Sequence, residues 1–121
     1  MNKIHIAFDV DGTLRKNSEE IHRTEIVENT EMITLLITLA KLTKNVTVHI
    51  WSNRGAEYCK RIRKEFRLEK YVKETNCHKK LWKAGQIKAV EANEDYFKPN
   101  IAIDDQQKFD GAFENIIVRL K

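Results

Sequence analysis

The chain has 121 residues, a formal net charge of +4 and 33% charged residues, which indicates a single small globular domain over residues 1–121. No apolar run is long enough to span a bilayer and the first residues lack the apolar core of a signal peptide, so we expect a cytoplasmic protein without a membrane partner. The two cysteines, Cys59 and Cys77, fit neither a metal-binding spacing nor a disulfide framework, in keeping with a reducing compartment.

The first predicted element is a short buried strand near the start of the chain. Ile4, Ile6 and Phe8 are β-favouring residues at period two. Gly12 permits a sharp turn where this strand runs into the sequence Asp9-Val10-Asp11-Gly12-Thr13-Leu14. Two carboxylates two positions apart at a strand end repel each other unless a cation lies between them. Mg²⁺, which takes hard oxygen ligands, is the natural cation.

The next elements alternate between helix and strand. The polar residues 15–28 predict a small hairpin or an irregular flap, and apolar residues at helical spacing predict a helix over residues 30–43. A β-branched run predicts a strand over residues 46–51, in which His49 and Trp51 are expected to belong to the core. Residues 56–67 predict a helix with one apolar face, which includes Cys59, and one basic face.

The remaining pattern completes an alternating order. We expect a short strand over residues 71–77 and a helix near residues 82–94, which Pro99 ends. Two further strands are predicted over residues 100–103 and 114–120. The order β-α-β-α-β-α-β-β predicts an α/β fold, a three-layer, Rossmann-like and mainly parallel sheet with helices on both faces.

Polar side chains follow three of the predicted strands. They are Asp9 and Asp11 after the first, Ser52 after the second, and Asp104 with Asp105 after a late one. The carboxyl ends of parallel strands share one edge of the sheet, and ligands bind at that edge where the strand order switches. Three strands that end in this way predict a site there.

These residue types suggest phosphoryl-group chemistry. Asp9 and one of Asp104 or Asp105 can hold Mg²⁺, while a second Asp9 oxygen attacks phosphorus as a nucleophile. Asp11 can protonate the leaving oxygen and later deprotonate water. Ser52 can donate a hydrogen bond to a phosphate oxygen, helped by backbone amides at the start of the following helix.

Residues 9–14, 50–54 and 101–105 resemble motifs I, II and IV of the haloacid dehalogenase (HAD) superfamily of phosphatases, in the right order over nearly the whole chain. The resemblance implies a HAD-like fold and an aspartyl-phosphate on Asp9. It makes Asp11 the general acid/base, which also gives its backbone carbonyl to Mg²⁺. It makes Asp104 the direct metal ligand, with Asp105 beside it. Phosphate binding is expected from four residues, Ser52, Asn53, Gly12 and Thr13.

A lysine should complete the set, because a phosphoryl group among carboxylates needs positive charge around it. In the family this lysine usually lies at or just before the helix that precedes the motif IV strand. Lys80 has that position, and its neighbours Lys79 and Lys83 share it. Lys98, directly before Pro99, is the equal alternative.

The chain resembles a small member of the family without a cap domain, similar to the phosphatase part of polynucleotide kinase-phosphatases. An open site of this kind suggests a large substrate or a partner subunit that covers it. Residues 60–88 hold eleven basic and three acidic residues, a net charge of +8, which attracts polyanions. A nucleotide or nucleic-acid terminal phosphate is therefore a candidate substrate beside a small ester such as a sugar phosphate.

The sequence thus predicts a Mg²⁺-dependent phosphomonoester hydrolase. The alternative on the same fold is a non-catalytic or regulatory protein that binds a phosphorylated ligand. A response-regulator receiver would need a different order of acidic residues, and a metal-dependent nuclease would cleave diesters without a covalent phosphate.

Overall fold

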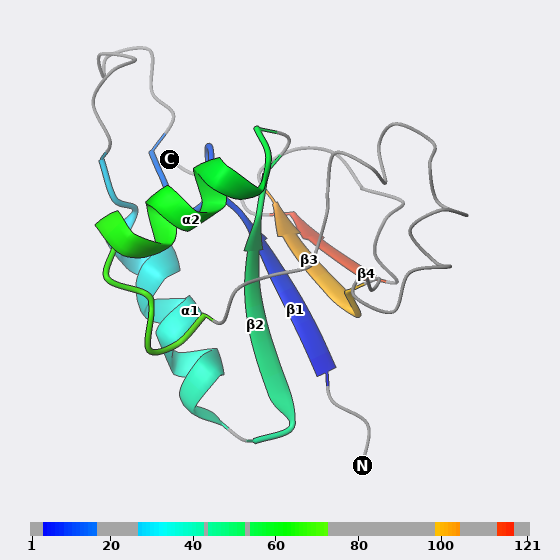
Figure 1. Ribbon diagram of the computed structural model, residues 1–121. Coiled ribbons are helices and arrows are strands. Elements are labelled where there is room, and N and C mark those ends of the chain that lie inside the picture. Colours follow the sequence, from blue (N-terminus) through cyan, green and yellow to red (C-terminus); the bar gives the residue numbers. More distant parts are fainter. Residues whose placement is uncertain are drawn as a thin grey trace.

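The computed structural model describes residues 4–16, 27–42, 44–52, 54–72, 99–104 and 114–117. Four strands and two helices lie within these ranges (Figure 1). In chain order they are β1 (Ile4–Asp9), α1 (Thr30–Leu42), β2 (Val46–Trp51), α2 (Ala56–Glu65), β3 (Ile101–Asp104) and β4 (Glu114–Ile117).

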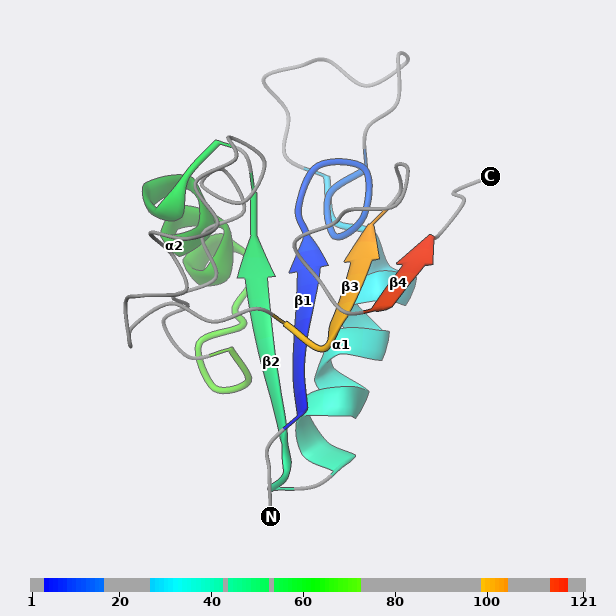
Figure 2. The same cartoon turned by 90° about the vertical axis from the view of Figure 1, so that its right-hand side faces the viewer.

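The four strands form one sheet in the order β2-β1-β3-β4, and every neighbouring pair is parallel (Figure 2). The chain first crosses from β1 to β2 on one side, and later enters β3 on the other side of β1. The strand order therefore reverses between β1 and β3, which is the position where open α/β sheets bind ligands. The predicted α/β class with a parallel sheet is confirmed.

Both described helices cover the same face of the sheet (Figures 1 and 2). The strand residues on that face alternate with those on the other, as the strand pleat requires. They join buried residues of α1 and α2 in one core, which includes Ile6, Phe8, Val48, Ile50, Ile103, Leu36, Cys59 and Ile62. The amphipathic pattern of the two helices is explained by this packing, and Cys59 is buried as expected.

The opposite face of the sheet is also shielded from solvent. Ala7, Trp51 and Ala102 lie on that face, and none of them is more than 1% exposed. His49 on the same face is 4% exposed, and its Nε2 lies 3.0 Å from Nδ1 of His5 in a hydrogen bond. His49 and Trp51 are therefore core residues, as predicted. The helix expected near residues 82–94 lies outside the described residues.

A tight loop and a hairpin stem follow β1. Gly12 has a positive φ of 84°, and the Arg15 N–H donates to the Val10 carbonyl at 2.9 Å. Arg15 then pairs with Glu28 in an antiparallel bridge, flanked by hydrogen bonds from Lys16 N to Val27 O at 2.8 Å and from Asn29 N to Leu14 O at 2.7 Å. The ends of the predicted flap thus form a hairpin stem, while residues 17–26 lie outside the described ranges.

The observed boundaries differ slightly from the predicted ones. The first helix ends at Leu42, and the second ends at Glu65 instead of residue 67. Val72 forms an isolated parallel bridge with Val48. Val72 belongs to the strand expected over residues 71–77, and residues 73–77 lie outside the described ranges. None of the helices in the described part of the chain has the length and apolar character needed to cross a membrane.

Candidate functional site

Asp9 and Asp104 end neighbouring strands at the switch point. Phe8 is in register with Ile103, so the next pair in register is Asp9 with Asp104. Parallel strands lie about 4.8 Å apart, and residues in register share a face of the sheet. Asp9 is 7% exposed and Asp104 is 5% exposed. Two buried carboxylates side by side repel each other, and a cation between them relieves that repulsion.

This pair suits Mg²⁺, which is usually bound by one or two carboxylates together with waters and substrate phosphate. Within the described ranges, no group of three or more His, Cys, Asp or Glu side chains gathers into a metal-binding cluster. Asp105 lies outside those ranges. Among the described residues, the carboxylate donors available to a metal at this point are Asp9 and Asp104.

The Asp11 carboxylate lies in a compact hydrogen-bonded group. Its Oδ1 accepts from the Tyr58 hydroxyl at 2.6 Å and from Arg15 Nη1 at 3.2 Å. Arg15 Nη1 also donates to the Tyr58 oxygen at 3.1 Å, which closes a triangle. On the other side, Asp11 Oδ2 lies 3.8 Å from Nη1 of Arg54. The loop after β1 and the first turn of α2 are joined through these contacts.

The two donors in this triangle keep their protons at neutral pH. Burial raises the pKa of the Tyr58 phenol, and its hydrogen bond to Asp11 raises it further. Burial lowers the pKa of Arg15, but its hydrogen bonds and charge interactions with Tyr58 and Asp11 outweigh that effect and raise it overall. Tyr58 and Arg15 therefore act as stable donors to Asp11.

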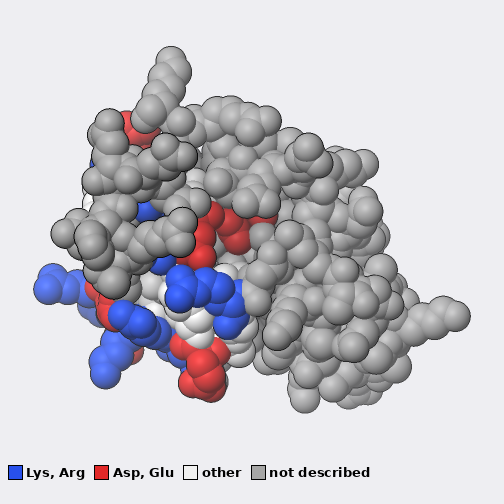
Figure 3. Space-filling model, turned by 90° about the horizontal axis from the view of Figure 1, so that it is seen from above, with Lys and Arg blue, Asp and Glu red and all other residues white. Residues whose placement is uncertain are grey.

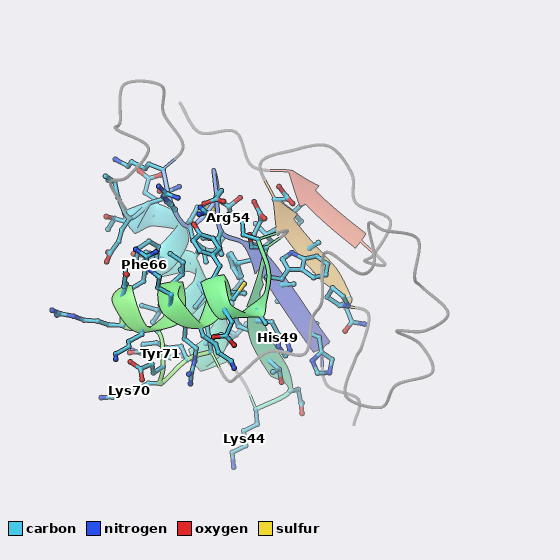
Figure 4. The ribbon with its side chains drawn as sticks, turned by 45° about the horizontal axis from the view of Figure 1, so that its top comes forward. Lys44, His49, Arg54, Phe66, Lys70 and Tyr71 are labelled. Atoms are coloured by element: carbon cyan, nitrogen blue, oxygen red, sulfur yellow. The ribbon has the colours of Figure 1, made fainter. Side chains whose placement is uncertain are left out.

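Arg54 lies beside Asp11, where β2 leads into α2 (Figure 4). Its guanidinium carbon lies 4.0 Å from the centre of the Tyr58 ring, and its side chain is 56% exposed. Seen from above, acidic side chains lie in the middle of this edge with Lys and Arg side chains beside them (Figure 3). Arg54 can therefore approach an anionic ligand while it stays stacked on the ring.

Ser52 is 6% exposed and follows directly after β2. Its Oγ accepts a hydrogen bond from the Arg54 N–H at 3.1 Å, so the hydroxyl proton is free to be donated elsewhere. Gly55 starts α2 with φ 100° and ψ 174°, a conformation that only glycine adopts readily. No side chain of the described residues caps this helix, so its first N–H groups favour an anion beside Ser52.

Gly12 and Thr13 use their backbone N–H groups inside the loop. Gly12 N donates to the Arg15 carbonyl at 2.8 Å, and Thr13 N donates to the Val10 carbonyl at 3.2 Å. The Thr13 side chain is fully buried, and its Oγ1 has no hydrogen-bond partner in the described part of the chain. The phosphate contacts predicted for Gly12 and Thr13 are therefore not formed here, because both backbone N–H groups donate within the loop and the Thr13 hydroxyl has no exposed surface.

The structure brings four of the predicted residues to one edge of the sheet, namely Asp9, Asp11, Ser52 and Asp104. Gly12 and Thr13 lie in the described loop after β1. The remaining predicted site residues, Asn53, Asp105, Lys80 and Lys98, lie outside the described ranges, as do Lys79 and Lys83.

Sequence reasoning missed Tyr58, Arg15 and Arg54 as neighbours of Asp11. The only local signal is the spacing of Arg15, four residues after Asp11. Tyr58 lies 47 positions from Asp11 in the sequence. In the helical pattern of residues 56–67, nothing distinguishes it from a residue at the border of the apolar face. Only the packing of α2 against the loop identifies it.

Comparison with protein-family models, with curated proteins and with solved structures gave no significant match to this chain.

Proposed function

We propose that this chain is a Mg²⁺-dependent phosphomonoesterase of the HAD superfamily that works through an aspartyl-phosphate on Asp9. The observation that carries the proposal is the buried pair Asp9 and Asp104 at the switch point of a parallel sheet. Ser52 at the end of the neighbouring strand supplies a hydroxyl donor at the same edge. Two carboxylates buried side by side suit metal-assisted chemistry, in which a cation relieves their mutual repulsion.

The reaction has two steps. An Asp9 oxygen attacks phosphorus as the bond to the leaving oxygen breaks, and Asp11 gives that oxygen a proton. Water then attacks the aspartyl-phosphate and gives its proton to Asp11, which releases inorganic phosphate and restores Asp9. Ser52 donates to a phosphate oxygen throughout. Mg²⁺, held by Asp9, Asp104 and the Asp11 carbonyl with Asp105 nearby, would neutralise charge between the carboxylates and the phosphoryl group.

The proposal includes a three-layer HAD-like architecture without a cap domain. It is supported by the burial of both sheet faces, since Trp51 and Ala102 are shielded on the side that α1 and α2 do not cover. A helix near residues 82–94 would form the third layer. In this arrangement Lys80 or Lys98 supplies the positive charge next to the phosphoryl group.

We further propose a nucleotide or a nucleic-acid terminal phosphate as the substrate. The exposed face of α2 and the turn after it are rich in basic residues. Two of these are paired with acids, Lys60 with Glu57 at 3.4 Å and Arg61 with Glu65 at 2.8 Å. Three more have no acidic partner within the described ranges, Lys64, Arg67 and Lys70. This excess of charge favours a polyanionic substrate over a small sugar phosphate, and a partner subunit could cover the open site.

The test is the release of phosphate from p-nitrophenyl phosphate, a sugar phosphate, and 3′- and 5′-phosphorylated oligonucleotides, with and without Mg²⁺. We expect Mg²⁺-dependent release by the wild type and only background release by Asp9→Asn, because the nucleophile is lost. Glu31→Gln, which neutralises an exposed carboxylate on α1, serves as the control and should keep full activity.

Mass spectrometry after an acid quench should find one phosphoryl group on Asp9 of the wild type. Turnover that survives Asp9→Asn would contradict the nucleophile assignment. Binding of phosphate without release from any ester would instead favour the phospho-ligand-binding alternative.

A further inference from the structure

The Tyr58 hydroxyl holds one particular oxygen of Asp11. Tyr58 is in the first turn of α2, and its hydroxyl donates to Asp11 Oδ1 at 2.6 Å, a short distance typical of a hydrogen bond to a carboxylate. Arg15 Nη1 reaches the same oxygen at 3.2 Å and the Tyr58 oxygen at 3.1 Å. Three polar groups thus fix one another, and rotation of the carboxylate would break two of these hydrogen bonds.

The two oxygens of Asp11 are therefore unequal. Oδ1 already accepts two hydrogen bonds, whereas in the described part of the chain no hydrogen bond reaches Oδ2 and its one ion-pair partner is Arg54 Nη1 at 3.8 Å. A proton on Oδ1 would compete with two donors. Oδ2 accepts neither of these hydrogen bonds, and the Asp11 side chain is 32% exposed, so the carboxylate is accessible to a ligand.

We propose that Tyr58 is a positioning residue that holds Asp11 by Oδ1 and thereby assigns Oδ2 to proton transfer. The inference rests on the proposed phosphatase function. In the first step the proton moves from Asp11 Oδ2 to the leaving oxygen as the phosphorus–oxygen bond breaks. In the second step Oδ2 takes a proton from the attacking water, so that the proton count balances over one turnover.

The role of Tyr58 should depend on the leaving group. An aryl oxide such as p-nitrophenolate leaves without protonation, whereas an alkoxide needs a proton as the bond breaks. A carboxylate that is free to rotate presents Oδ2 in the productive geometry for less of the time. In the first step, Tyr58 therefore favours alkyl phosphates, which include sugar and nucleotide monoesters, and has little influence on aryl phosphates.

The test compares Tyr58→Phe with Tyr71→Phe. Both variants remove only a hydroxyl, and Tyr71 lies away from Asp11, where its ring is 5.5 Å from Lys41 Nζ. Each is assayed with p-nitrophenyl phosphate and with whichever of glycerol 3-phosphate, a nucleoside 3′-monophosphate or a nucleoside 5′-monophosphate the wild type hydrolyses fastest. We expect Tyr58→Phe to lower kcat/KM, which reports the steps up to release of the leaving group, at least about tenfold for the alkyl ester and by no more than about twofold for the aryl ester. Tyr71→Phe should change none of these values.

An equal loss on both esters, or no loss on either, would overturn the role of Tyr58 while leaving the proposed function intact. A wild type that releases no phosphate from any ester overturns the proposed function and this inference with it.

Thermal unfolding establishes that the variants are folded. If Tyr58→Phe does not fold, Arg15→Lys takes its place, because a lysine keeps the charge but lacks the guanidinium Nη1 that donates to both Asp11 Oδ1 and the Tyr58 oxygen. It should show the same selective loss with the alkyl ester, and an unselective loss would again overturn the role.

Discussion

The pKa of His49 lies far below its ordinary value. The residue is 4% exposed on β2, on the sheet face that the two described helices do not cover (Figure 4). Burial lowers the pKa of His49 to about 3, and the nearby charge of His5 adds to the effect. The folded protein therefore keeps this imidazole neutral well below the pH at which a free histidine gains a proton.

A pH dependence of stability follows from His49. Between the ordinary pKa of 6.5 and the folded value of about 3, the unfolded chain binds a proton at this position and the folded chain does not. The free energy of unfolding should thus fall as the pH is lowered through this window, by about 1.4 kcal/mol per pH unit from His49 alone. Urea titrations over the window should show a shallower fall in His49→Gln than in the wild type. Parallel curves for the two proteins would contradict the assignment.

At the scale of single residues, the sequence is sufficient to predict those site residues that the topology of the sheet alone brings together. Asp9, Ser52 and Asp104 end parallel strands, and parallel strands end at one edge whatever the rest of the chain does. The Tyr58 contact to Asp11 could not be predicted in this way. It depends on the orientation of α2 about its own axis and on its packing against the loop after β1, and no local sequence pattern specifies either.

At the scale of elements, α2 has an unusual backbone conformation at each end. Gly55 precedes it with φ 100°, and Arg67 follows it with φ 56°. At the C-terminus, Leu68 N donates to Arg63 O at 2.9 Å and Arg67 N donates to Lys64 O at 3.1 Å. This is the Schellman arrangement, which usually has glycine at the position of Arg67. The predicted helix ran to residue 67 because the sequence carries no glycine to indicate its end.

Substitutions at the two ends of α2 should change stability in opposite directions. Arg67→Gly removes the cost of a left-handed conformation and should raise the free energy of unfolding by about 1 kcal/mol. Gly55→Ala should lower it by about 1–3 kcal/mol through backbone strain alone, because an added Cβ would meet no atom within 4 Å. Chemical denaturation measures both changes. Lys70→Gly is the control, since Lys70 has no positive φ and should gain nothing. A stabilised Lys70→Gly, or an unchanged Arg67→Gly, would contradict the explanation.

At the scale of the whole molecule, the strands and their parallel direction could be predicted, but their order could not. β-branched and apolar runs mark β1, β2 and β3, and the helices between them indicate crossover connections. Nothing local to β3 specifies that it pairs with β1 instead of extending the sheet beyond β2. That choice is made by packing between residues far apart in the chain, and it creates the switch point.

The charge of the molecule is divided unevenly, which gives a test of the proposed polyanionic substrate. Residues 60–88 carry +8 and the rest of the chain carries −4. We expect Lys64→Gln/Lys70→Gln to weaken binding of a 3′- or 5′-phosphorylated oligonucleotide. The slope of log Kd against the logarithm of the salt concentration should decrease by about 0.7 for each phosphate that the variant no longer neutralises.

The matched control is Lys41→Gln/Lys44→Gln, which removes two exposed lysines from the end of α1 and the turn before β2. It should leave both the affinity and the salt dependence unchanged. Equal effects in the two double variants would mean that the oligonucleotide responds to net charge and not to the α2 surface.

The hairpin stem formed by Arg15 and Glu28 has a consequence for how such a protein can diversify. The stem brings together, near Asp11, the two ends of the segment over residues 17–26. A change in the length of that segment therefore need not move β1 or α1. Each doubling of a flexible loop costs only about 0.6 kcal/mol of closure entropy. Insertions at this point can therefore remodel the surroundings of the site at little thermodynamic cost while the strand that carries Asp9 stays in place. The stem is the natural junction at which to graft a new recognition element.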